Sequence, residues 1–252
     1  MRADTLKAMS DQFAMPFDAA ASLEGVASAM AATRDGIDAL LRDRGLRRTS
    51  PEDTAQSLLL GAASTASLEL SEPIDPEALA AGEGAPTARA ALRLSTELLG
   101  LVPVLRQSPL QAFARIHALA ASGSVPDDEL GRPAGPEGAE RLGSLARRLT
   151  QPTTAPALVV AALAHADIAT SRPFLSHSGV VARAVERLVL VERGVDPASV
   201  TVPEAGHAQD AWSYRSALTA FGAGTDEGTA QWLRYASLAF ARGAESSPLA
   251  TR

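Results

Sequence analysis

The residues with the clearest chemical potential lie in one short segment, 172–183, which reads RPFLSHSGVVAR. An Ala-rich apolar run ends just before it, and a new helical pattern starts at Val180. A helix, a short loop and a second helix in this order form a geometry that can bind an anion. The N–H groups of the loop and the positive end of the second helix dipole point the same way. The segment therefore predicts an anion site between two helices.

The same segment resembles the core motif of the Fic/Doc domain family, His-Pro-Phe-x-(Asp/Glu)-Gly-Asn-Gly-(Arg/Lys)-x-x-Arg. The matching residues are Pro173, Phe174, Gly179 and Arg183. In that family the loop and second helix bind the phosphates of ATP, the motif His takes a proton from a target hydroxyl, and AMP is transferred to a protein Ser, Thr or Tyr. The resemblance implies an all-α, Fic/Doc-like helical domain. Binding of ATP and Mg²⁺ is implied by the resemblance alone. The residues themselves indicate no certain cofactor.

The groups that perform the family's chemistry are replaced in this chain. Arg172 stands at the place of the catalytic His, and a guanidinium stays protonated and cannot act as a base. Ser176 stands at the place of the Mg²⁺-binding carboxylate and supplies only a neutral hydroxyl. Val180 replaces the first Arg, which would hold the outer phosphates. We therefore expect a catalytically impaired pseudoenzyme that acts as a binding or regulatory module.

An enzyme of altered mechanism is the alternative. His177 would replace the missing base, and Arg172 and Arg183 would clamp a phosphate-linked group on a protein substrate. Otherwise His177 is an exposed loop histidine without a role in chemistry. A third hypothesis is a plain helical interaction protein, for which a homodimer is one form. The residues assigned to phosphate binding are Arg172, Ser176, Ser178, Gly179 and Arg183.

A second motif lies upstream and resembles the inhibitory motif of Fic proteins, (Ser/Thr)-x-x-x-Glu-(Gly/Asn). Its Glu pairs with the second Arg of the core motif. Thr65 and Glu69 have that spacing, and Leu70 stands where Gly or Asn is expected. The resemblance predicts an ion pair between Glu69 and Arg183, the alternative for Arg183 being a phosphate ligand. The loop 122–135 stands where the family has its target-docking flap.

The remaining histidines and charges have simpler interpretations. His165 is expected to be a buried structural residue, and His207 to lie at a helix start. No metal site is predicted, because His207 has no second ligand one helical turn away. The run VERLVLVERG, residues 185–194, is interpreted as a solvated helix face. Four aromatic residues are expected to pack the last two helices together: Trp212, Tyr214, Trp232 and Tyr235.

Composition limits the classes of partner. The 252-residue chain has a net charge of −6, which argues against nucleic acid and anionic membranes. It has no cysteine, so disulfides and thiolate chemistry are excluded. No apolar run reaches the roughly 18 residues of a membrane span, so a cytoplasmic protein is expected. The expected partner is a protein or a phosphate-bearing small molecule. The chain is rich in Ala and Arg and has Lys7 as its only lysine, which indicates a GC-rich, bacterial genome.

Helical spacing of apolar residues runs through nearly the whole chain, so an all-α fold is predicted. Residues 1–49 should form a leader and an N-terminal helix, residues 50–243 the Fic-like domain, and residues 244–252 a disordered tail. Ser50 and Thr87 are expected to cap helices, and Pro51 and Pro109 to begin them. The predicted helices cover 22–46, 51–70, 76–82, 87–100, 109–121, 136–149, 155–170, 180–193, 207–221 and 226–243.

Overall fold

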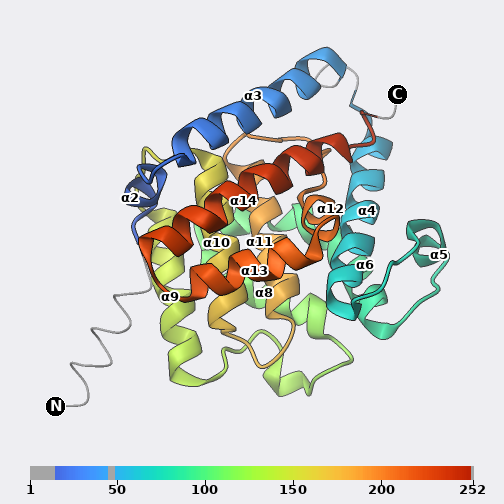
Figure 1. The fold of residues 1–252 in the computed structure, drawn as a ribbon. Helices are drawn as coiled ribbons and strands as arrows, with labels where there is room; N and C mark the ends of the chain where they lie inside the picture. Colours follow the sequence, from blue (N-terminus) through green and yellow to red (C-terminus); the bar gives the residue numbers. More distant parts are fainter. Residues whose placement is uncertain (1–14, 45–48, 251–252) are drawn as a thin grey trace.

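The computed structural model describes residues 15–44 and 49–250, and every regular element in these ranges is a helix (Figure 1). The only β-type pairing among them is an isolated bridge between Ser122 and Val125. The all-α prediction is confirmed. The elements are α2 Phe17–Ala21, α3 Val26–Arg44, α4 Pro51–Leu70, α5 Pro76–Ala80, α6 Pro86–Leu98, η1 Leu99–Leu101, α7 Val102–Gln107, α8 Pro109–Ala121, η2 Asp127–Glu129, α9 Gly135–Thr150, α10 Ala157–Ser171, α11 Ser178–Glu192, α12 Pro203–Ala208, α13 Ala211–Gly222 and α14 Asp226–Glu245.

Two helices, α10 and α11, form the centre of the molecule. α10 is buried without interruption from Leu158 to Ala166, and α11 from Val180 to Leu190. A helix that is buried on all sides, as α10 and α11 are over these residues, requires other helices to cover every side. In Figure 1, α13 and α14 cross in front of α10, and both helices pack against it. None of the described helices combines the length and apolar composition needed to cross a lipid bilayer.

The helix α4 brings the upstream motif to α11. Its start is fixed by a capping box, in which the Asp53 N–H donates to Ser50 Oγ and the Ser50 N–H donates to Asp53 Oδ2, at 3.3 and 2.9 Å. Small residues over 61–66 (GAASTA) let α4 approach α6 and α12 closely. Since Thr65 and Glu69 are one turn apart on this helix, both face the start of α11.

The N-terminal helix α3 joins the same core as the rest of the chain. It packs along α14, where Met30 and Ile37 are buried and the Thr33 hydroxyl donates to the Ser237 carbonyl oxygen at 3.0 Å. The predicted leader lies largely in 1–14, outside the described residues, as does the segment 45–48.

Some sequence predictions are wrong in detail. Thr87 is not a cap, because α6 begins one residue earlier at Pro86, whose fixed φ suits the first helical position. The predicted helix 207–221 is two helices, α12 and α13. Residues 244–250 are ordered, and Leu249 is only 1% exposed because it packs into the core. Trp212 is 73% exposed, whereas Tyr214, Trp232 and Tyr235 are buried as expected.

The crossing of α12 and α14 gives a test of the fold. A Cβ added to Gly206 would lie 1.8 Å from the Ala239 carbonyl oxygen, so the two helices would have to separate. We expect Gly206→Ala to lower the free energy of unfolding by about 3 kcal/mol or more. The matched control is Gly36→Ala on α3, where nothing lies within 4 Å of the added atom. That change should raise stability by up to about 1 kcal/mol. Urea denaturation measures both, and equal effects would contradict the packing.

Candidate functional site

Two non-glycine residues in the loop between α10 and α11 have a left-handed backbone conformation. Arg172, the C-cap of α10, has φ 45°, and His177, the N-cap of α11, has φ 59°. Left-handed backbone at non-glycine residues costs about 1 kcal/mol each, so neighbouring contacts must impose it. Two buried residues do so. The Pro173 carbonyl oxygen accepts from the Ala134 N–H at 2.8 Å, and the Phe174 ring stacks on His117 with centroids 4.3 Å apart.

The predicted contact between Glu69 and Arg183 is present. Arg183 is 2% exposed, and its Nη2 donates to Glu69 Oε1 at 2.5 Å. Its Nη1 donates to the Tyr214 hydroxyl at 3.2 Å and its Nε to Thr65 Oγ1 at 3.4 Å. Because an unpaired buried guanidinium would be very unfavourable, these three partners fix its position. The upstream motif is therefore joined to the loop segment in space, although more than 100 residues separate them.

Glu69 also lies against the start of α11. A Cβ added to Gly179 would be 2.5 Å from Glu69 Oε1, so the carboxylate sits directly over the first turn of the helix. The N-cap residue His177 makes no side-chain capping hydrogen bond there. The first turn of a helix carries partial positive charge and favours an anion. Glu69 thus occupies the position at which an external anion would contact both the positive first turn of α11 and the guanidinium of Arg183.

His177 is half-buried between two serine residues. Its Nδ1 lies 2.7 Å from Ser176 Oγ, and its Nε2 lies 3.4 Å from Ser124 Oγ in the loop 122–135. Burial lowers the pKa of His177, an effect that the nearby charge of Glu69 partly opposes. The imidazole is therefore neutral at neutral pH and keeps a lone pair that can accept a proton.

The other predicted phosphate-binding residues are not gathered around Arg183. Arg172 is exposed, and within 15–44 and 49–250 no polar contact joins its side chain to the pair of Glu69 and Arg183. The Ser178 hydroxyl is turned back and donates to the Phe174 carbonyl oxygen at 3.4 Å. Ser176 is bonded to His177. Thr65, Glu69, Gly179 and Arg183 thus form one group, and Ser124, Ser176 and His177 form a second.

One turn further along α11, Arg187 makes an ion pair that the sequence did not reveal. It is 2% exposed and binds Glu204 through Nε and Nη2 at 2.8 and 2.6 Å. Ser57 and Ser199 accept from its Nη1. The prediction that residues 185–194 form a solvated face is wrong over 185–190, because Glu186 is also fully buried. The sequence feature that could have predicted this burial is the Val and Leu residues around the charges, which leave this segment without a continuous polar face.

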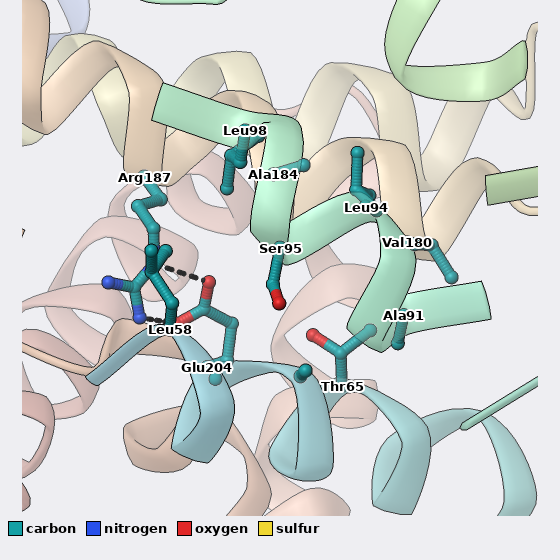
Figure 2. Close-up of a pocket in the computed structure, with 12 residues that line it drawn as sticks. Leu58, Thr65, Ala91, Leu94, Ser95, Leu98, Val180, Ala184, Arg187 and Glu204 are labelled. Atoms are coloured by element: carbon teal, nitrogen blue, oxygen red, sulfur yellow. Dashed lines mark hydrogen bonds and ion pairs between the residues drawn. The ribbon is translucent and has the colours of Figure 1, made fainter. Parts of the chain in front are cut away.

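A small cavity lies between α4, α6 and α11, below this group (Figure 2). Figure 2 shows Thr65 and Val180 on its wall, and the ion pair of Arg187 and Glu204 at one side. Its volume of about 20 Å³ holds a single water molecule. A nucleotide therefore does not fit there, and a larger ligand would have to approach from the loop side of α11.

Comparisons with known proteins establish the fold. No protein-family model and no curated protein sequence matches the chain. A solved structure of a Fic family protein from Desulfovibrio desulfuricans G20 is similar, with a TM-score of 0.67 and 13% identity over 86% of this chain and 73% of that one. Fic-1 from C. elegans (aa134–508) gives a TM-score of 0.57 and 14% identity over 96% and 73%. The chain has a Fic-type fold, as the motif resemblance predicted.

The environment of His177 predicts a pH dependence. Its pKa in the folded state is below the ordinary value of about 6.5, mainly through burial. Its contribution to stability is therefore complete above about pH 6.5 and is lost as the pH falls through the folded-state pKa. We expect the free energy of unfolding to fall less steeply below about pH 6.5 in His177→Gln than in the wild type. Urea denaturation between about pH 8 and about pH 5 measures this, and identical slopes would contradict it.

Proposed function

We propose that this protein is a catalytically impaired Fic-fold protein that acts as a binding or regulatory module. One observation carries the proposal. The frame of the family's motif is kept, with Pro173 and Phe174 anchoring the loop and Arg183 on the next helix, but an exposed arginine, Arg172, stands where the base would act. A guanidinium cannot take a proton from a target hydroxyl. Transfer of AMP by the family's usual route is therefore not expected.

The position of the metal ligand supports the same conclusion. Ser176 offers a neutral hydroxyl, which is directed to His177 at 2.7 Å. Mg²⁺ prefers carboxylate oxygen. With Val180 at the place of the first arginine, the outer phosphates of ATP would also lack a cationic clamp. Of the motif's two phosphate-binding arginine positions, only that of Arg183 is kept in this chain, and Arg183 is already paired with Glu69.

The internal carboxylate explains how such a module would be controlled. Glu69 is one residue from the end of α4, its side chain is 30% exposed, and the following Ser71 has left-handed backbone at φ 57°. A protein partner that displaced the last turn of α4 would free both Arg183 and the first turn of α11. The ligand of the opened site would be a phosphate-bearing molecule, and the resemblance suggests a nucleotide. We further propose a cytoplasmic location and leave a homodimer as an alternative form.

Binding of a nucleotide tests the control by Glu69. In Glu69→Gln the side chain keeps its shape but loses its charge, so ATP should bind at least about tenfold more tightly than to the wild type, a difference of about 1.4 kcal/mol. Glu72→Gln is the matched control, since Glu72 is exposed just beyond α4. Isothermal titration measures the affinities. Equal affinity of Glu69→Gln and the wild type would contradict the role of Glu69.

Labelling with ATP carrying a radioactive α-phosphate tests the absence of transferase activity. The protein, Mg²⁺ and a bacterial lysate should give no labelled protein above background, for the wild type and for Glu69→Gln. Glu69→Gln is included because it removes the internal anion that would mask an active site. Labelling that requires Arg183 would contradict the proposal.

One observation favours the alternative enzyme. His177 is neutral, partly accessible and next to the first turn of α11, as a replacement base would need to be. If labelling is found, His177→Ala should abolish it under this alternative, whereas Ser124→Ala should leave most of it.

A further inference from the structure

Two histidines and a glutamate from three different helices meet in the core. His165 lies on α10, Glu186 on α11 and His207 on α12, and all three are 0% exposed. The donor atoms that they turn toward one another all lie within 4.8 Å. The site described above does not use these groups, and no spacing in the sequence indicates that they meet.

The spacing of the donor atoms matches that of ligands around one metal ion. Glu186 Oε1 lies 3.0 Å from His165 Nδ1, and Glu186 Oε2 lies 2.9 Å from His207 Nε2. In a tetrahedral zinc site, two ligands that are each about 2.1 Å from the ion are about 3.4 Å apart. Glu186 therefore places one carboxylate oxygen beside each imidazole, within about half an ångström of the separation that an ion between them would produce.

The outer nitrogen of each ring is held by a tyrosine. His165 Nε2 lies 2.9 Å from the Tyr214 hydroxyl, and His207 Nδ1 lies 3.1 Å from the Tyr235 hydroxyl. A metal-binding histidine usually has its second ring nitrogen fixed in this way, which orients the ring and selects the tautomer. Both inner nitrogens are thereby directed to the same side as the carboxylate.

Hydrogen bonding does not satisfy the whole cluster. His165 Nδ1 and Glu186 Oε1 are fully buried and 3.0 Å apart, yet neither has a hydrogen-bond partner, because their alignment is poor. Buried polar atoms are rarely left without a partner, and each costs about 1–3 kcal/mol. A cation between them would satisfy both.

We propose that His165, Glu186 and His207 bind one divalent transition-metal ion, for which Zn²⁺ is the best match. Two imidazole nitrogens and both oxygens of Glu186 supply four donors of the type that zinc accepts. With every ligand buried, the site is closed and structural. It ties α10, α11 and α12 together. The Tyr214 hydroxyl, which contacts His165, also accepts from Arg183. The ion would therefore help to fix the position of Arg183 through His165 and Tyr214.

Metal analysis of untagged, purified protein tests this proposal. Mass spectrometry of the elements should find about one first-row transition-metal ion per chain in the wild type. His207→Ala and Glu186→Gln should contain at least about tenfold less. Two matched controls should keep the metal: His177→Ala, which removes a histidine outside the cluster, and Glu192→Gln, a charge change on the same helix α11.

A second measurement uses only the wild type, because the variants could fail to fold. The protein is unfolded in urea with a chelator, and then refolded with Zn²⁺, with Mg²⁺ or with neither. Metal binding to a buried site is coupled to folding, so Zn²⁺ alone should raise the melting temperature. Purified wild type without transition metal, together with equal melting temperatures after all three refoldings, would overturn the proposal and leave the cluster as a network of side chains alone.

Discussion

The burial of charged side chains along α11 is the constraint on which the structure depends. Arg183, Glu186 and Arg187 are each no more than 2% exposed, in the segment Val180–Leu190 of α11, whose other residues are Val, Ala and Leu. Leaving one such charge unpaired would cost several kcal/mol, so each requires partners from another helix. α4 supplies Glu69, α10 supplies His165, and α12 supplies Glu204 and His207. The polar contacts of one central helix therefore fix the positions of three others around it.

The same contacts define the candidate site. The charge of Glu69 compensates Arg183, and at the same time it lies over the positive first turn of α11. In the proposed function, one carboxylate would both stabilise the fold and fill the anion position, so that an external anion would have to compete with a folded-state interaction. Under the proposed function, the backbone of the loop 172–178 and the Arg183 side chain would position a ligand, with Arg172 and Ser176 standing at the places of the family's base and Mg²⁺ ligand.

The sequence predicted the parts of the structure that depend on local spacing. The helices and the loop follow from caps and apolar periodicity. The pairing of Glu69 with Arg183 follows only from the resemblance of two short motifs to those of Fic proteins. It did not predict partners that are brought together only by the fold. Glu186 meets His165 and His207 across three helices, and no spacing in the chain signals this. Threonine suits a cap position, which favours Thr87, but Pro86 starts the helix first. The aromatic character of Trp212 favours the core, but its side chain is exposed to solvent.

A crystal structure of Glu69→Gln soaked with pyrophosphate would show whether Glu69 stands where an anion binds. We expect density for the anion between the first turn of α11 and Arg183, with a phosphate oxygen within hydrogen-bond distance of the Gly179 N–H and the Arg183 guanidinium. Pyrophosphate bound elsewhere at saturating concentration, with this position empty, would mean that Glu69 does not stand at an anion site.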